Sequence, residues 1–481
     1  MALFCRFGKK SFQMHYKPKL YMKRFFHLFT LVLLMLSAGI LIQSCGDGNN
    51  TESPIKVVRS YSHNAATDWN NLFLEVERHA SGYRPGPAPR ALAYLGFSAY
   101  EACVPGMPDH NSLANLFAGL NVPSADEGEY YWPEVVNASY GYLMPRFFPH
   151  VSNDLKQKIA TLEAANESKY LQETTQEIFD RSRNRGREVA AVIWAWSATD
   201  THGHAAYEDP FNDYDWQANY KKVGDWVPTT PGPGKGMFPY WGKVRTFALP
   251  ESAKICRPPL PYSEATNSAL YSQAIEVYAQ NTPTLSFAAE WVGEFWSDDL
   301  LDLTFSPPAR WIAIANQVLG AEQSSLETAL ETYAKVGMAI NDAGVGCWNS
   351  KYYYNVERPQ TYIRRLIDPA WNTNLDNPLT GDNSLTPSFP AYPSGHATFG
   401  AAGAEALASV FGYSYSMTDR CHEGRSEFIG TPRTFGSFFE MAQENAWSRV
   451  PLGVHFRMDA EEGVHYGTRI GRFINNLPWR K

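Results

Sequence analysis

The segment AYPSGHATFGAAGAEALASVFG, residues 391–412, joins a Pro-Ser-Gly turn to a long run of alanine and glycine. Serine is a preferred helix N-cap, and the small residues that follow it predict a helix that packs closely against a neighbour. The turn also brings a hydroxyl group and helix N-terminal amides together, an arrangement suited to binding an anion. Neither role requires His396. It is therefore a candidate functional residue, with a hydrogen-bonded histidine in an ordinary helix cap as the alternative.

The remainder of the chain has the pattern of a helical protein. Its 481 residues are 44% hydrophobic and 14% aromatic, which is ample for one large core or two smaller ones. Segments such as APRALAYLGFSAYEAC place apolar residues three and four positions apart, and we find no run of the alternating pattern that strands show. We predict a mainly α fold of helical bundles with long ordered loops.

This pattern divides the chain into two helical regions. The N-terminal helical region, residues 61–262, ends in a long stretch rich in proline, glycine, tryptophan and aspartate, and loops of this length are often functional. The C-terminal helical bundle spans residues 263–478. Its longest helical segment begins with Ser324 three residues before Glu327, the spacing of a capping box.

The first 60 residues have the composition of a targeting segment and a linker. Residues 1–45 contain a basic start, an apolar run and then Cys45, an order that resembles a bacterial lipoprotein signal peptide. The resemblance implies that Cys45 is lipidated as the first residue of the mature chain, and Met22 is an alternative start. Residues 46–60 predict a flexible tether. We expect an exported protein, periplasmic or at the cell surface and anchored to the membrane, with an uncleaved N-terminal anchor as the alternative.

The charge balance argues against a nucleic-acid partner. Without residues 1–45 the chain has 35 Lys and Arg against 49 Asp and Glu, a net charge of −14, whereas nucleic-acid binding needs a basic face. Four cysteines remain, and an exported protein can pair them in three ways that the sequence does not distinguish. They are Cys103, Cys256, Cys347 and Cys421.

Two cations and a histidine–aspartate pair flank the PSGH turn in the sequence. In KYYYNVERP, Lys351 and Arg358 lie seven positions apart, which on a helix places both on one face, and Pro359 interrupts the helix or starts a loop. A solvent-exposed charge pair is the alternative for this segment.

In SRVPLGVHFRMD, Asp459 follows His455 by four positions, so that its carboxylate can hold one ring nitrogen. The other nitrogen then keeps a free lone pair, suited to a ligand or a nucleophile. A surface pair is the alternative here. Together with Arg449, Ser394 and the Gly395 amide, these groups form a set suited to a tetrahedral oxyanion.

The three segments in this order resemble the signature of the superfamily of vanadium-dependent haloperoxidases and type 2 phosphatidic acid phosphatases. The matching pattern is Lys-x6-Arg-Pro, then Pro-Ser-Gly-His, then Ser-Arg-x5-His. The longer segments DAGVGCWNSKYYYNVERP and FPAYPSGHATFG resemble the haloperoxidase branch, and the likeness extends over residues 285–460. EFWSDDLLDLTFSPPARW resembles the segment that carries an acidic residue of that branch, here Asp299, with Asp298 as the alternative.

The resemblance implies a role for each residue. His455 would bind vanadium, oriented by Asp459 or a backbone carbonyl, and His396 would be the acid–base group where peroxide binds. Lys351 would polarise the bound peroxide, and Asp299 would pair with Arg449. The oxygens of vanadate would be held by Lys351, Arg358, Arg449, Ser394 and the Gly395 amide.

These roles imply a vanadate-dependent haloperoxidase that oxidises halide with hydrogen peroxide to hypohalous acid. Trp348 and Phe389 occupy positions that line the halide pocket in the chloroperoxidases, with two core aromatics as the alternative. The main rival is an acid phosphatase of the same superfamily, which needs no vanadate. It would act on a phosphate monoester, with His455 as the nucleophile and His396 as the general acid. A non-catalytic oxyanion-binding lipoprotein is a third hypothesis.

Overall fold

The computed structural model describes residues 56–229, 232–280 and 284–481. The predicted signal peptide, Cys45 and most of the predicted tether lie outside the described residues. Of the structure, 53% is helix and 3% is strand, so the predicted mainly α fold is confirmed. The two strands, β1 (Met417–Asp419) and β2 (Arg433–Phe435), form one antiparallel hairpin.

Fourteen α-helices and five short 3₁₀ helices are seen in the described residues. The α-helices are α2 (Asn64–Arg78), α3 (Pro87–Cys103), α4 (Trp132–Phe147), α5 (Asn153–Leu171), α6 (Gln176–Ala198), α7 (Trp216–Asn219), α8 (Ala269–Ala279), α9 (Phe287–Phe295), α10 (Arg310–Ala321), α11 (Leu326–Tyr354), α12 (Pro359–Leu366), α13 (Gly395–Phe411), α14 (Phe438–Trp447) and α15 (Arg457–Asn475). The 3₁₀ helices are η1 (Val58–Ser60), η2 (Val104–Gly106), η3 (Ala114–Leu116), η4 (Trp241–Lys243) and η5 (Glu251–Ala253).

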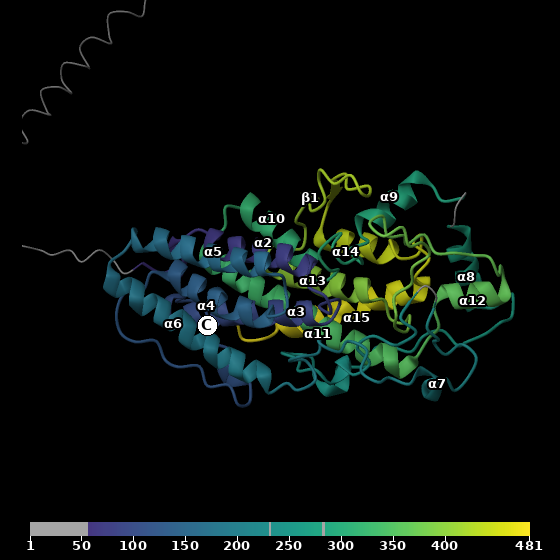
Figure 1. Cartoon of the computed structure of the whole chain (residues 1–481), viewed down its shortest axis with the longest axis horizontal. Helices are drawn as coiled ribbons and strands as arrows, with labels where there is room; N and C mark the ends of the chain where they lie inside the picture. The colour runs from purple at the N-terminus through teal and green to yellow at the C-terminus, as the bar shows by residue number, and fades with distance from the viewer. Residues whose placement is uncertain (1–55, 230–231, 281–283) are drawn as a thin grey trace, which may run out of the picture. The chain divides into compact units, whose positions relative to one another are not determined.

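Three long helices, α11, α13 and α15, pack against one another in the middle of the described structure (Figure 1). Helix α13 is the alanine- and glycine-rich segment, and it lies closely against α15 because α15 presents glycines to it. A Cβ atom added at Gly467 would lie 2.2 Å from the carbonyl oxygen of Thr398. The small residues of both helices therefore set the distance between them.

The N-terminal helices belong to the same compact unit as this centre. Helix α3 packs along α11, and α4 packs against α3, α5 and α6. At the other end of the chain, Trp479 stacks edge-on against Tyr100 with 5.2 Å between ring centroids, and its carbonyl accepts the Asn111 amide. The described residues thus belong to one compact unit, so the predicted boundary at residues 262/263 does not separate two compact units.

The predicted tether is wrong for its last residues. Val58 lies in η1 and its side chain is fully buried. The predicted start of α11 is also displaced by one residue, because Ser325 rather than Ser324 is the N-cap and accepts the Thr328 amide. Val58 is thus part of the packed structure, and the helix begins where the Ser325 hydroxyl accepts a free amide.

Cys103, Cys256, Cys347 and Cys421 are all unpaired in the structure, and the first three are buried. Within residues 56–229, 232–280 and 284–481, we find no helix that is both long and apolar enough to span a membrane.

We predict that Gly467→Ala lowers the free energy of unfolding by about 1–3 kcal/mol, because the added methyl group must push α15 away from the α13 backbone. Gly320→Ala in α10 is the matched control, since nothing lies within 4 Å of its added Cβ. This control should be neutral or more stable by about 0.5–1 kcal/mol. The measurement is the thermal unfolding midpoint of each variant. Equal midpoints for the two variants would contradict the packing argument.

Candidate oxyanion site

The predicted site residues come together although five separate parts of the chain carry them. Lys351 lies in the last turn of α11, Arg358 is the N-cap of α12, and Ser394 is the N-cap of α13. Arg449 follows α14, and His455 precedes α15. All five side chains are buried.

Lys351 and Arg358 do not share a helix face, so the reasoning from their spacing is wrong. Helix α11 ends at Tyr354, and Asn355 follows in the left-handed conformation with φ of 50°. The chain then turns, and Arg358 begins a new helix with Pro359 at its first position. A single left-handed residue and a proline at N1 are standard ways to end one helix and start another.

Backbone carbonyls hold both cations in place. Lys351 Nζ donates to the carbonyls of Pro390 at 2.9 Å and Ala391 at 2.7 Å, and Arg358 Nε donates to that of Phe389 at 3.0 Å. The three carbonyls belong to the segment that leads into α13. This segment therefore positions the cations as well as the helix N-terminus.

His455 has a defined tautomer. Its Nδ1 lies 2.9 Å from Asp459 Oδ2, and the same carboxylate oxygen accepts the Phe456 amide at 3.0 Å. Arg358 Nη1 lies 3.2 Å from Nε2 of His455. Since arginine only donates, Nε2 carries the lone pair and Nδ1 carries the proton. Burial, with Arg358 and Lys351 beside it, lowers the pKa of His455 well below its usual value, so the ring is neutral and suited to bind a metal.

Arg449 pairs with Asp299, the residue that the sequence favoured over Asp298. The distance from Arg449 Nη2 to Asp299 Oδ2 is 2.7 Å. Asp298 instead lies 3.1 Å from Arg310 and 2.7 Å from His422, and all three side chains are buried. The neighbouring aspartates thus bind different arginines.

The cations retain unused donors. Among the described residues, Nη2 of Arg358 and both Nε and Nη1 of Arg449 are buried without a hydrogen-bond partner. Buried polar atoms in native proteins are nearly always paired. The first helix amides also lack an intrahelical acceptor, and Gly395 is the first residue of α13. A tetrahedral oxyanion would satisfy these donors, so the residues present fit vanadate or phosphate.

His396 lines the same cavity as Arg449 and His455. Its Nε2 lies 2.9 Å from the Ser297 carbonyl, to which it donates, and 3.8 Å from Asp299 Oδ2. Nδ1 therefore carries the lone pair. Burial and then the Arg449 cation lower the pKa of His396 to about 4. The ring is neutral at neutral pH and able to accept a proton.

The site opens into a cavity of 450 Å³ that reaches His396, Arg449 and His455. Trp348 and Phe389 also line this cavity, with ring centroids 4.8 Å apart. The Phe389 ring lies 5.1 Å from Lys351 Nζ, within the range of a cation–π contact. The two aromatics predicted for a halide pocket therefore lie beside the buried cations.

Several known proteins resemble this chain in sequence or in fold. A family model described as the VCPO second helical-bundle domain matches residues 331–477. The chain is 29% identical to vanadium chloroperoxidase from Curvularia inaequalis, over 46% of this chain and 46% of that protein, so it spans about half the length of this relative. It is also similar to the crystal structure of the first bacterial vanadium-dependent iodoperoxidase, with 28% identity, a TM-score of 0.75, and coverage of 89% of this chain and 98% of that one. These findings support the vanadium haloperoxidase superfamily as the family of this chain.

A more distant likeness supports the fold alone. The crystal structure of a holo-type bacterial vanadium-dependent chloroperoxidase has a TM-score of 0.58 and 14% identity, and it covers 90% of this chain and 96% of that one. We call the residues predicted to hold the oxyanion the cradle: Lys351, Arg358, Ser394, Gly395, Arg449 and His455. The family model includes all of them, since Lys351 and His455 both lie within residues 331–477.

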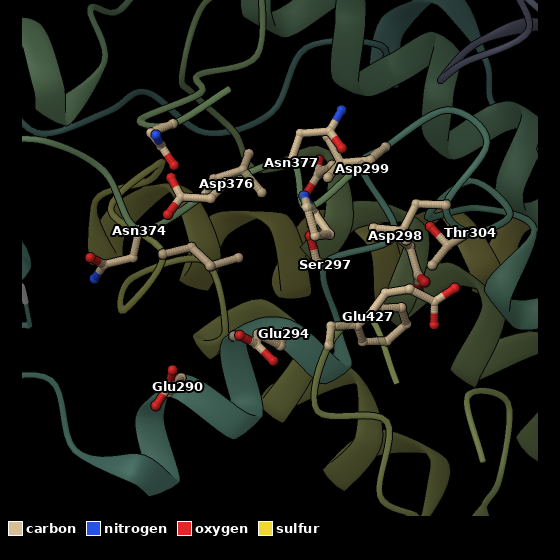
Figure 2. Close-up of a pocket in the computed structure, with 18 of the residues that line it drawn as sticks. Glu290, Glu294, Ser297, Asp298, Asp299, Thr304, Asn374, Asp376, Asn377 and Glu427 are labelled. Atoms are coloured by element: carbon tan, nitrogen blue, oxygen red, sulfur yellow. The ribbon is translucent and has the colours of Figure 1, made fainter. Parts of the chain in front are cut away.

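A second pocket, of 300 Å³, adjoins the first and has acidic walls. Figure 2 shows Glu290, Glu294, Asp376 and Glu427 around its open centre, with Asp299 at its edge. Asp299 also lines the 450 Å³ cavity, so this carboxylate borders both spaces. The acidic walls of this pocket disfavour anions.

Sequence reasoning missed the carbonyl groups of the site. Those of Ser297, Phe389, Pro390, Ala391 and Val454 bind His396, Lys351 or Arg358. No side-chain pattern identifies a carbonyl, because every residue has one.

We predict that orthovanadate raises the thermal unfolding midpoint of the wild-type protein, since a ligand at 100 times its Kd stabilises the folded state by about 2.7 kcal/mol. Arg358→Met should lose most of this shift, because the substitution removes the guanidinium group and its N–H donors. Arg420→Met is the control, as its side chain is exposed on the surface. The readout is the vanadate-induced shift of each variant relative to its own midpoint. An undiminished shift in Arg358→Met would show that the anion binds elsewhere.

Proposed function

We propose that this chain is a vanadate-dependent haloperoxidase that oxidises halide with hydrogen peroxide to hypohalous acid. One observation carries the proposal: His455 and Arg449 line an open cavity, Arg358 Nη1 lies 3.2 Å from Nε2 of His455, and both guanidinium groups have buried donors without a partner. The relatives named as a vanadium chloroperoxidase and a vanadium-dependent iodoperoxidase support it.

The residues suited to hold vanadate divide into one ligand and five donors. His455 would bind the metal through Nε2, with Asp459 holding Nδ1–H. The negative oxygens would be held by Lys351, Arg358, Arg449, the Ser394 hydroxyl and the Gly395 amide. When bound, vanadate activates hydrogen peroxide for a two-electron oxidation of halide.

The chain supplies a fixed positive field and a proton acceptor. Lys351 and Arg358 are held by carbonyls that cannot neutralise them, so their charge remains available to oxygens in the site. Burial lowers the pKa of Lys351 and raises that of Asp459, and a bound oxyanion favours the charged form of the lysine. His396 accepts a proton at Nδ1 while the Ser297 carbonyl fixes its ring.

Trp348 and Phe389 give the halide an apolar approach to the cations. A halide ion beside these rings exchanges part of its hydration for contact with Lys351 and Arg358, which lie within 5.1 Å and 5.0 Å of the Phe389 ring. We assign the halide position to this corner of the cavity. The structure favours no particular halide.

We expect wild-type protein loaded with orthovanadate to oxidise bromide and iodide with hydrogen peroxide, and the vanadate-free protein to be inactive. His455→Ala should abolish this activity because the metal ligand is lost. His396→Ala should retain vanadate binding but lose about 10²–10⁴-fold in kcat, the usual effect of removing an acid–base group. His465→Ala, an exposed histidine on α15, is the control that keeps full activity.

The same assay separates the two rival functions. An acid phosphatase would hydrolyse an aryl phosphate without vanadate and would lose this activity in His455→Ala, with no halide oxidation in any sample. A passive oxyanion-binding protein would bind vanadate but show neither activity, even as the wild type.

We also propose that the chain is exported and anchored through a lipid on Cys45, on the evidence of the basic and apolar segment before this residue. In a bacterial host, Cys45→Ala should move the protein from the membrane fraction to the soluble exported fraction. Cys5→Ala is the matched control and should stay with the membranes. Retention of Cys45→Ala in the membrane fraction would support an uncleaved anchor instead.

A further inference from the structure

Three consecutive residues after α9 lie beside the oxyanion site. The Ser297 carbonyl accepts the Nε2–H group of His396 at 2.9 Å, and the Asp299 carboxylate binds Arg449 at 2.7 Å. Asp298 lies between them in the chain, and Figure 2 shows all three residues, which line the acidic pocket. The first and third residues orient the proposed acid–base group and one of the cations, and these contacts give Asp298 no role.

Asp298 has an uncommon backbone conformation. Its φ is 40°, in the left-handed region that residues with a Cβ atom rarely adopt. Such a conformation persists only where the surrounding structure holds it, and it is frequent near functional sites. With this turn in the chain, Ser297 and Asp299 contact the site while the Asp298 side chain is buried among other partners.

Both oxygens of the Asp298 carboxylate have a buried partner. Oδ2 lies 3.1 Å from Arg310 Nη1, and Oδ1 lies 2.7 Å from His422 Nε2. Arg310 also binds Asp419 in β1 at 2.8 Å, and Arg84 donates to the Asp298 backbone carbonyl at 3.3 Å. Asp298 is therefore fixed through its side chain and its backbone. We call Asp298, Arg310 and His422 the Asp298 cluster.

Aromatic neighbours hold the His422 ring in one orientation. It stacks on Phe305 with 5.3 Å between ring centroids, and Phe428 lies edge-on to it at 5.0 Å. Burial lowers the pKa of His422, so the ring is neutral at neutral pH. Burial alone would raise the pKa of Asp298, but Arg310 and His422 hold it below its usual value. The ionised carboxylate only accepts, so His422 donates its single ring proton from Nε2.

We propose that the three residues of the Asp298 cluster are positioning residues of the active site, acting through the two residues beside Asp298. A carboxylate fixed at both oxygens restricts the peptide groups on either side of its Cα atom. On one side this holds the Ser297 carbonyl against His396. On the other side it holds the Asp299 carboxylate against Arg449. The effect on turnover rests on the proposed haloperoxidase function, whereas the effect on His396 does not.

The alternative is a cluster that only stabilises the fold. Arg310 begins α10, and its pairing with Asp419 joins this helix to β1. If this were its only role, loss of the His422 donor would lower the thermal unfolding midpoint and change nothing at the site. The two roles therefore differ in the state of the His396 ring, which can be measured without any ligand.

The first test is nitrogen NMR of the histidine rings in the full vanadate-free chain at neutral pH. Wild-type His396 should carry its proton on Nε2, because this atom donates to the Ser297 carbonyl. His422→Phe keeps the aromatic packing but removes the donor to Asp298. The Ser297 carbonyl then loses its fixed position, and both tautomers of His396 should appear. His422→Gln supplies a side-chain N–H donor and should restore the single tautomer, and His396→Gln identifies the His396 signals.

His79→Phe is the matched control for this measurement. His79 lies 2.7 Å from Asp302, which also has a positive φ, of 64°, but both side chains are exposed. Loss of this surface pair should leave the single His396 tautomer unchanged. A single tautomer in His422→Phe as well would overturn the proposal.

Asp298→Asn is a second variant in case His422→Phe does not fold. Asparagine has the shape of aspartate, and Arg310 keeps its pairing with Asp419. Only one end of the asparagine amide accepts a hydrogen bond, so the side chain is no longer fixed at both positions. The same mixture of His396 tautomers is expected, and a single tautomer in this variant would contradict the positioning role.

The second test measures vanadate binding and turnover in the same variants. His422→Phe should raise the Kd for orthovanadate and lower kcat for bromide oxidation, each by about 10–100-fold, the usual effect of removing a group that orients a metal site. His422→Gln and His79→Phe should remain close to the wild type. Wild-type Kd and kcat in His422→Phe would overturn the proposal. If the wild-type protein oxidises no bromide with vanadate, the haloperoxidase function fails instead, and the His396 tautomer still decides the positioning role.

Discussion

The burial of three cations at one place is the constraint on which the rest of the structure depends. Lys351, Arg358 and Arg449 are almost inaccessible to solvent, and the carboxylates nearest to them belong to Asp299 and Asp459. A buried donor without a partner costs about 1–3 kcal/mol, yet several guanidinium N–H groups of the site have none among the described residues. The unpaired donors lower the stability of the folded chain, but they are already positioned to bind an oxyanion.

The packing of α13 on α15 brings the two histidine segments into register. The Ser394 amide donates to the Asp459 carbonyl at 2.9 Å. This contact is possible because Gly463 has no side chain, so that the two helices can approach closely. A Cβ there would lie 2.5 Å from that of Ala397 and 2.9 Å from the Ser394 carbonyl oxygen. The alanine- and glycine-rich sequence is therefore a condition for the site as well as for the fold.

Sequence reasoning succeeded where the relevant geometry is local and failed where the chain changes direction. The pairing of His455 with Asp459 follows from four-residue spacing at a helix start, and the structure contains it. The common helix face of Lys351 and Arg358 does not exist, because one left-handed asparagine ends α11 between them. The carbonyls that hold the cations and the walls of the cavity depend on tertiary packing, which the spacing of side chains does not encode. The mainly α fold was predictable because apolar periodicity decides it, whereas the single compact unit depends on contacts such as Trp479 with Tyr100.

Asp299 connects the electrostatics of the cradle to the two spaces beside it. Its carboxylate binds Arg449, lies 3.8 Å from His396, and borders both the apolar cavity and the acidic pocket. On the acidic side, Glu290, Glu294, Asp376 and Glu427 repel anions, while on the apolar side the cations attract them (Figure 2). Asp299 borders both spaces. The charges that line each space therefore favour different molecules: the acidic pocket disfavours anions, and the cations beside the apolar cavity favour them.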